Sequence, residues 1–369
     1  MKIKEVIIRH LKMDLVTPFQ TSFMTEYDRD FLLLEVKDES GVIGFGESVA
    51  MRDPLYNEET CQTNWHILEE YLIPMLLNKE LNHPDEVSEI FKPIKRNNMA
   101  KSAIEGAVWD IYCQLTNQSL KEAIGGTRDK IEVGVSIGIQ PTSEQLVETV
   151  TQYVDEGYKR IKIKIKPGFD LEPLRAVRKQ FPHIPLMADA NSAYSLEDLD
   201  HLKQLDELDL MMIEQPLASD DIVDHRKLQE AMETPICLDE SILSLEDTRK
   251  AIELGSTKII NIKIGRVGGI TEAIKIHDYC KEHEIPVWCG GMLESGIGRA
   301  HNIALTSLSN FTLPGDTSSS ARYWKKDIIS PEVVMEDGYI HVPNEVGIGY
   351  EIDRDAVNQY TIKEKVYRA

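Results

Sequence analysis

The stretch Ile184-Pro-Leu-Met-Ala-Asp189 decides the fold, because it is a short apolar run that ends on a carboxylate. Two further runs have the same form, Leu210-Met-Met-Ile-Glu214 and Pro235-Ile-Cys-Leu-Asp239. The three acidic residues recur about 25 residues apart, which is about the length of one βα unit. This spacing predicts that the three carboxylates lie side by side at the C-terminal ends of three successive parallel strands.

Carboxylates placed so closely repel one another unless they share a cation. A set of ligands made only of oxygens suits Mg²⁺ or Mn²⁺ better than zinc. We therefore expect Asp189, Glu214 and Asp239 to hold a divalent metal ion, with Mg²⁺ as the cofactor and Mn²⁺ as a substitute.

Lysines occur on the neighbouring apolar stretches. Lys162 and Lys164 lie within residues 160–166, and Lys263 ends residues 258–263. Side chains two residues apart on a strand point to the same face, so Lys162 and Lys164 point inward together. Alone, this stretch is typical of a solvated edge strand, but its carboxylate-bearing neighbours favour an interior position. There the charge of Lys162, a metal ion and burial would lower the pKa of Lys164 enough for a neutral amine base.

The rest of the chain predicts a (β/α)₈ barrel. Strand-like runs at 132–138, 285–289 and 311–315 bring the total to eight, each about 23 to 28 residues from the next, with amphipathic helices between them. An open doubly wound sheet is the alternative, but it requires a Gly-rich phosphate turn after its first strand. The nearest candidate, Gly265-Arg-Val-Gly-Gly269, follows the sixth strand.

The flanking segments have a different pattern. The first 60 residues alternate in the manner of antiparallel strands, and helical segments follow to about residue 124. We expect an α+β domain at 1–127, the barrel at 128–324, and a C-terminal segment at 325–369 that packs back on the first domain.

Composition limits the class of protein. The formal net charge of −21 argues against binding to nucleic acid or an anionic membrane. No apolar run approaches the roughly 20 residues of a membrane span, and no signal-peptide core is present at the N-terminus. The five cysteines lack metal-type spacing and predict reduced thiols in a cytoplasmic protein.

Five strings in barrel order resemble the enolase superfamily over essentially the whole chain. The resemblance is to the muconate lactonizing enzyme subgroup, in the branch that holds o-succinylbenzoate synthases and N-acylamino acid racemases. The strings are Arg160-Ile-Lys-Ile-Lys164, Ala188-Asp-Ala-Asn191, Ile213-Glu-Gln-Pro216, Leu238-Asp-Glu-Ser241 and Asn261-Ile-Lys-Ile-Gly-Arg-Val-Gly-Gly269.

The resemblance implies a mechanism on a small-molecule carboxylate. Lys164 would remove the proton α to the carboxylate, while Lys263 and the metal would stabilise the enediolate, which is the known scheme of the superfamily and not a result of the sequence. Dehydration to 2-succinylbenzoate for menaquinone biosynthesis returns the proton from Lys164 to the leaving hydroxyl, whereas racemization uses Lys263 on the opposite face. The sequence leaves this choice open. The residues implied to support the site are Lys162, Asn191, Glu240 and Arg266.

The resemblance also implies an N-terminal capping domain whose two loops, 17–22 and 47–51, fold over the barrel mouth, and a homo-oligomeric assembly. Phe19 and Met51 would form an apolar side of the pocket, although both could equally be core residues of the small domain. Other implied substrate-binding positions are Ser136, Gly291, Met292 and Leu293. One departure is Ile264, which follows Lys263 where relatives commonly have proline.

A different class of function is a barrel that binds an anionic metabolite without turnover. The presence of every acid/base and metal position favours the enzyme over that alternative.

Overall fold

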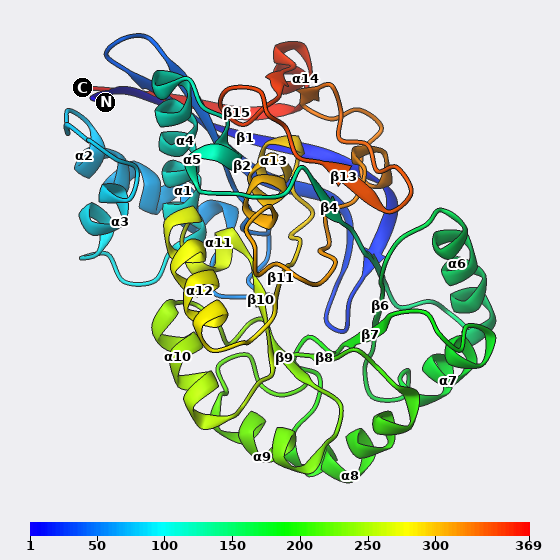
Figure 1. Ribbon diagram of the computed structural model, residues 1–369. Helices are drawn as coiled ribbons and strands as arrows, with labels where there is room; N and C mark the ends of the chain where they lie inside the picture. Colours follow the sequence, from blue (N-terminus) through cyan, green and yellow to red (C-terminus); the bar gives the residue numbers. More distant parts are fainter.

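The computed structural model describes all 369 residues. Its centre is a curved sheet of seven parallel strands in sequence order, wrapped by helices (Figure 1). Together with the N-terminal antiparallel domain this is the predicted (β/α)₈ barrel with a cap. The barrel strands are β5 (Val135–Ile137), β6 (Ile161–Lys164), β7 (Leu186–Asp189), β8 (Ile213–Glu214), β9 (Ile236–Leu238), β10 (Ile259–Ile262) and β11 (Val287–Cys289).

The predicted eighth strand is not regular. Residues 311–315 make two isolated parallel bridges, Val287 with Phe311 and Val133 with Gly315, in place of a continuous ladder. Pro314 lacks a backbone N–H, so this segment could not donate a backbone hydrogen bond to a neighbouring strand from every residue. The two bridges still connect the edges of the sheet, and the barrel closes through them.

Helices on the outside of the barrel begin where the sequence supplies caps. Thr142 accepts a hydrogen bond from Gln145 N at 3.2 Å at the start of α6, and Ser244 caps α10 in the same way. The outer elements are α6 (Ser143–Asp155), α7 (Leu171–Gln180), η2 (Leu196–Asp198), α8 (Leu199–Leu202), η3 (Lys203–Leu208), α9 (Val223–Ala231), α10 (Leu245–Leu254), α11 (Ile264–Val267), α12 (Ile270–Glu282) and α13 (Gly296–Thr306).

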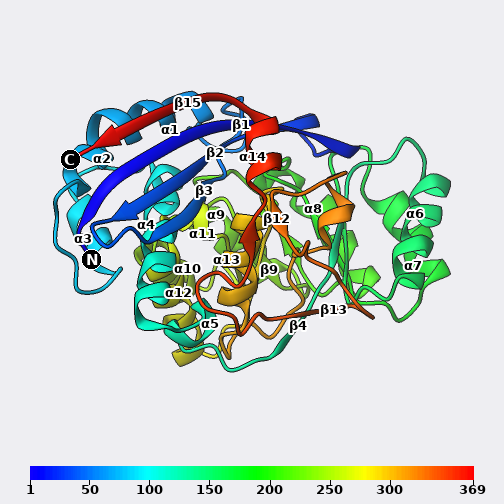
Figure 2. The same ribbon diagram turned by 90° about the horizontal axis from the view of Figure 1, so that it is seen from above.

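A four-stranded antiparallel sheet of order β15-β1-β2-β3 lies beside the barrel (Figure 2). Its strands are β1 (Ile3–Gln20), β2 (Thr25–Asp38), β3 (Ile43–Ser48) and β15 (Thr361–Arg368). The helical part of this layer comprises α1 (Cys61–Ile67), η1 (Leu68–Leu72), α2 (Ile73–Leu76), α3 (Glu86–Phe91), α4 (Asn98–Thr116) and α5 (Leu120–Ala123).

Helix α4 lies very close to β3, and two glycines make this approach possible. A Cβ on Gly44 would lie 2.1 Å from the carbonyl oxygen of Ala107, and one on Gly46 would lie 1.9 Å from that of Ala103. Any side chain at these positions would push the helix off the sheet. The loop that follows β3 is thereby held against the barrel.

The hairpin between β1 and β2 reaches down toward the barrel strands (Figure 1). Gln20 O accepts a hydrogen bond from Ile139 N at 3.0 Å, just beyond the end of β5. The hairpin therefore forms part of the wall above the C-terminal ends of the strands.

The C-terminal segment returns to the N-terminal layer. Strand β15 pairs antiparallel with β1, so the two chain ends lie side by side (Figure 1). Before that, the chain forms η4 (Ser320–Arg322), β12 (Ile329–Ser330), β13 (Tyr339–His341), β14 (Glu351–Ile352) and α14 (Arg354–Tyr360); β13 pairs with β4 (Lys130–Glu132).

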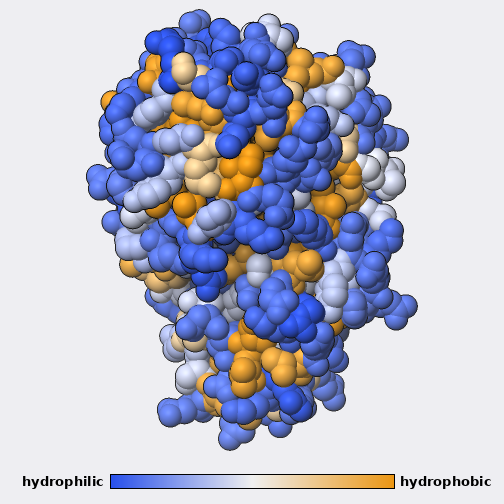
Figure 3. All heavy atoms as spheres, turned by 90° about the vertical axis from the view of Figure 1, so that its left-hand side faces the viewer, coloured by the Kyte–Doolittle hydropathy of each residue, from blue (hydrophilic) through white to orange (hydrophobic).

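The surface is predominantly hydrophilic on the face shown in Figure 3, where apolar side chains form scattered groups. Exposed residues such as Tyr71 and Leu115 are of a kind that ordinary globular surfaces carry. None of the helices combines the length and the apolar character that a membrane crossing requires.

Candidate active site

The strand register brings the acidic residues together. Lys164 on β6 is opposite Asp189 on β7, and Asp189 is opposite Glu214 on β8. Glu214 is in turn opposite Cys237 on β9, and Asp239 follows two residues later on the same face. The three carboxylates are almost completely buried, with 1 % of Asp189 and 0 % of Glu214 and Asp239 exposed.

Lys162 lies among three carboxylates. Its Nζ is 2.6 Å from Asp316 Oδ2, 3.1 Å from Glu214 Oε2 and 3.4 Å from Asp189 Oδ2. It also lies 4.8 Å from the centroid of the Trp288 ring. Burial alone would lower the pKa of Lys162, but the surrounding negative charges outweigh burial and hold the pKa above its ordinary value. Lys162 is therefore a fixed positive charge beside Lys164.

Lys164 binds the next two polar groups along the barrel. Its Nζ is 2.5 Å from Asp189 Oδ2 and donates to Asn191 Oδ1 at 2.7 Å. Asn191 in turn donates from Nδ2 to Glu240 Oε1 at 3.0 Å. This chain of contacts fixes the lysine at the edge of the cavity.

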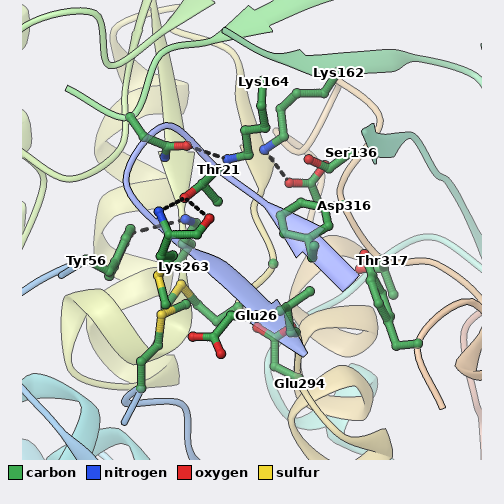
Figure 4. Close-up of a pocket in the computed structure, with 18 of the residues that line it drawn as sticks. Thr21, Glu26, Tyr56, Ser136, Lys162, Lys164, Lys263, Glu294, Asp316 and Thr317 are labelled. Atoms are coloured by element: carbon green, nitrogen blue, oxygen red, sulfur yellow. Dashed lines mark hydrogen bonds and ion pairs between the residues drawn. The ribbon is translucent and has the colours of Figure 1, made fainter. Parts of the chain in front are cut away.

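Lys263 follows β10 and enters the site from another part of the barrel (Figure 4). Its Nζ is 2.7 Å from Asp239 Oδ2 and 3.2 Å from the hydroxyl of Tyr56. Tyr56 donates to Asp239 Oδ1 at 3.0 Å, and Arg266 also binds this carboxylate. Burial would lower the pKa of Lys263, yet the neighbouring acids raise it well above its ordinary value.

The cluster contains two glutamates whose pKa values are strongly raised by burial. Burial, together with the charge of Asp189, raises the pKa of Glu214 well above its ordinary value. Burial and the charge of Asp239 raise the pKa of Glu240 to about 8, and Oε2 of this residue has no hydrogen-bond partner. These groups resist ionisation unless more positive charge arrives.

The donor set fits a divalent cation in its chemistry. It consists of oxygens only, it lies at adjacent strand ends, and the raised pKa of Glu214 marks a shortage of positive charge. In the arrangement of this structure no three acidic, His or Cys side chains surround one point. The ammonium and guanidinium groups of Lys162, Lys263 and Arg266 contact the carboxylate oxygens in this arrangement.

A partly open cavity lies in front of these groups (Figure 4). Four cationic side chains, Lys162, Lys164, Lys263 and Arg299, line it, whereas Glu240 and Arg266 line a separate depression. The predicted substrate-binding residues all belong to its lining: Phe19, Met51, Ser136, Gly291, Met292 and Leu293.

The cavity also contains residues that the sequence reasoning missed. Tyr56 lies in a loop of the first domain, Glu26 is on β2, and Arg299 is in the first turn of α13. No local pattern in the sequence indicates that these three residues meet at one cavity. Asp316 was different, because it directly follows the eighth predicted segment, 311–315, at the position where a carboxylate of the barrel mouth is expected.

Comparison with known proteins gives a consistent result over the whole chain. Residues 3–125 match the mandelate racemase / muconate lactonizing enzyme N-terminal domain, and residues 145–356 match the enolase C-terminal domain-like family.

Individual relatives cover the chain from end to end. The chain is 59% identical over 365 residues to an o-succinylbenzoate synthase of Geobacillus kaustophilus, covering 99% of this chain and 97% of that protein. It is 46% identical over 369 residues to an N-succinylamino acid racemase of Thermus thermophilus, covering 100% of both. A crystal structure of an enolase superfamily member from Listeria innocua superposes with a TM-score of 0.97 at 45% identity, covering 100% of this chain and 99% of that one.

Proposed function

The chain belongs to the enolase superfamily, and we propose that it is an o-succinylbenzoate synthase that dehydrates 2-succinyl-6-hydroxy-2,4-cyclohexadiene-1-carboxylate. Enzymes of this superfamily act on small molecules and generally depend on a divalent metal ion. The observation that carries the proposal is that Lys164, which lines the cavity, lies 2.5 Å from Asp189 Oδ2, so the proposed base adjoins a proposed metal ligand.

We propose Mg²⁺ as the cofactor, held by Asp189, Glu214 and Asp239. When bound, the ion would act as a Lewis acid that makes the proton next to the substrate carboxylate more acidic. It would also displace the cationic side chains from these three carboxylates. Lys164, released from Asp189, would then be available as the base.

The proposed reaction uses one lysine twice. Lys164 takes the proton from the ring carbon that bears the carboxylate, and the electron pair of that C–H bond moves into the carboxylate to give an enediolate. The electrons then return to form the ring double bond as the C–O bond to the hydroxyl breaks. Lys164 gives its proton to the departing oxygen, so water leaves and the ring becomes aromatic.

The other polar residues would hold charge in place. Lys162 stays protonated among its acids and adds a positive charge beside Lys164. Lys263 would place a second positive charge against the enediolate. Asn191, which accepts from Lys164 at 2.7 Å, would fix the direction from which the base approaches.

Parallel assays on two substrates test the proposal. Purified protein with Mg²⁺ should convert the cyclohexadiene carboxylate to 2-succinylbenzoate, which is detected by its aromatic absorbance. The same preparation is assayed with N-succinyl-L-methionine by loss of optical rotation. Absence of 2-succinylbenzoate formation at saturating Mg²⁺ would contradict the proposal.

N-Acylamino acid racemization is a second candidate, either alone or beside dehydration. The observation that favours it is Lys263, which lines the same cavity as Lys164 but directly follows β10, whereas Lys164 ends β6. Two bases on opposite faces of one carbon would invert it. In D₂O, Lys263→Arg should retain exchange of the α-proton of one enantiomer only, and Lys164→Arg that of the other. Exchange of both enantiomers at the wild-type rate in either variant would contradict two-base inversion.

We also propose a homo-oligomer in the cytoplasm, supported by the family resemblance and by the five cysteines, all of which are buried free thiols. Light scattering after size-exclusion chromatography would measure the assembly, and a monomeric mass of 41.9 kDa would contradict it.

A further inference from the structure

Arg299 is a buried cationic residue in the wall of the cavity, and one of its N–H groups has no hydrogen-bond acceptor. It lies in the first turn of α13, it is 2 % exposed, and it belongs to the cavity lining. Its Nη2 donates to the backbone oxygen of Glu294 at 3.0 Å, and its guanidinium lies 5.2 Å from the centroid of the Tyr323 ring. Its Nη1 has no hydrogen-bond partner. The charge of Arg299 is therefore shielded from water but not paired.

The other deeply buried arginines are all satisfied. Arg160 is 2.9 Å from Asp316 Oδ1, and Arg266 is paired with Asp239. Arg29 donates to four backbone carbonyl groups around it. Arg299 alone among these four residues has a guanidinium nitrogen without a hydrogen-bond partner, and it forms no ion pair; burying such a group is costly. An anion bound at Nη1 would offset this cost.

The acids nearby do not serve as that anion. Glu294 accepts from Asn302 Nδ2 at 3.0 Å, and Glu47 accepts from Ser295 and from Gly298 N at 2.9 Å. Neither carboxylate forms an ion pair with Arg299. The guanidinium of Arg299 is therefore a cation in the cavity lining that no acidic side chain neutralises.

The position of Arg299 suits the far end of a substrate. Glu294, whose carbonyl oxygen holds the guanidinium, lies on the side of the pocket away from Lys162 and Lys164 (Figure 4). A substrate whose reacting carboxylate faces the lysines would extend its other end toward this wall. Tyr323 supplies a flat surface beside it.

We propose that Arg299 binds the second carboxylate of a dicarboxylate substrate, the one at the end of the succinyl chain. This inference rests on the proposed function, because both candidate substrates carry a succinyl group. A carboxylate would take the free Nη1 donor and neutralise the buried charge, which is the geometry that arginine offers better than lysine. Arg299 is thus a specificity-determining residue, and it takes no part in proton transfer.

Binding measurements test the assignment without turnover. The two ligands are 2-succinylbenzoate and the primary amide of its succinyl chain, which has the same shape without the second charge. Calorimetry with Mg²⁺ should show that the wild type prefers the dicarboxylate by at least about tenfold. Arg299→Met should lose this preference and bind both ligands alike. Arg322 also lies over the Tyr323 ring, at 5.4 Å, but does not line the cavity, so Arg322→Met is the matched control and should keep the preference.

The same variants separate a binding role from a structural one. Because Arg299→Met removes an unpaired buried charge, it should melt at or above the wild-type temperature. Arg299→Lys, which keeps the charge, should keep part of the preference and provides the comparison if the methionine variant does not fold. Equal weakening of both ligands by Arg299→Met, an unchanged preference, or no preference in the wild type would overturn the assignment. A wild type that prefers the dicarboxylate but forms no 2-succinylbenzoate would contradict the proposed function alone.

Discussion

Lys263 Nζ lies 2.7 Å from Oδ2 of Asp239, so a residue proposed for proton transfer is paired with a residue proposed for metal binding. The same is true of Lys164 and Asp189 at 2.5 Å. Metal ion and lysine therefore compete for the same oxygens. Metal binding would add positive charge to the site, and it would also free the two lysines to contact the substrate.

This competition leads to a prediction about metal removal. EDTA should abolish turnover, and Mg²⁺ or Mn²⁺ should restore it, because the freed lysines return to the carboxylates when no cation is present. Mg²⁺ should also raise the melting temperature, since it binds the folded state. Activity assays and thermal melts of chelated and reloaded protein measure both effects. Full activity of the metal-free protein would show that the carboxylates have another role.

Asp316 neutralises two buried cations and should be important for stability. It lies 2.6 Å from Lys162 and 2.9 Å from Arg160, and it follows the segment that closes the barrel. Asp316→Asn should lower the free energy of unfolding by about 3–5 kcal/mol, because it leaves buried charges unpaired. Denaturant titration measures the change.

An exposed acid provides the control for that comparison. Asp224 pairs with Lys227 on the surface of α9, so Asp224→Asn should change the free energy of unfolding by less than about 0.5 kcal/mol. Equal effects of the two substitutions would mean that the contacts of Asp316 contribute no more than a surface ion pair.

Glu59 gives the stability a dependence on pH. Its carboxylate accepts from Met99 N and Ala100 N at the start of α4, and burial raises its pKa to about 7. The folded state then holds its proton more tightly than the unfolded state, so stability from this group falls as the pH rises from about 4.5 to about 7. Glu59→Gln removes that dependence.

The measurement is the difference in free energy of unfolding between wild type and Glu59→Gln at pH 5, 6, 7 and 8. The wild type should lose stability relative to the variant by up to about 3 kcal/mol over this range. A wild type that gains stability over the variant with rising pH would show that ionisation of Glu59 is favoured in the folded protein.

The parallel strands could be predicted from the sequence because each strand is marked by a short local pattern. Asp189 and Glu214 end short apolar runs, and parallel pairing in register places such ends side by side. The same reasoning was wrong for the regularity of residues 311–315, where Pro314 restricts the hydrogen bonding. The roles of the lysines and carboxylates, and the domain boundaries at 127 and 324, stay predictions.

Other features depend on how distant segments meet. Tyr56 contacts Asp239, which is 183 residues away in the sequence, and no local pattern indicates that contact. The unpaired state of Arg299 depends on where Glu47 and Glu294 direct their carboxylates. Contacts of this kind become visible only when the two domains are packed together.

One rate tests the central claim most directly: 2-succinylbenzoate formation by Lys164→Ala, compared with the wild type at saturating Mg²⁺ and substrate. If Lys164 both removes the α-proton and protonates the leaving hydroxyl, the variant should be slower by at least about 10²-fold. Circular dichroism and Mg²⁺ binding should match the wild type, because the three carboxylates remain. A Lys164→Ala rate within about threefold of the wild type would contradict the role of Lys164 and the reaction proposed here.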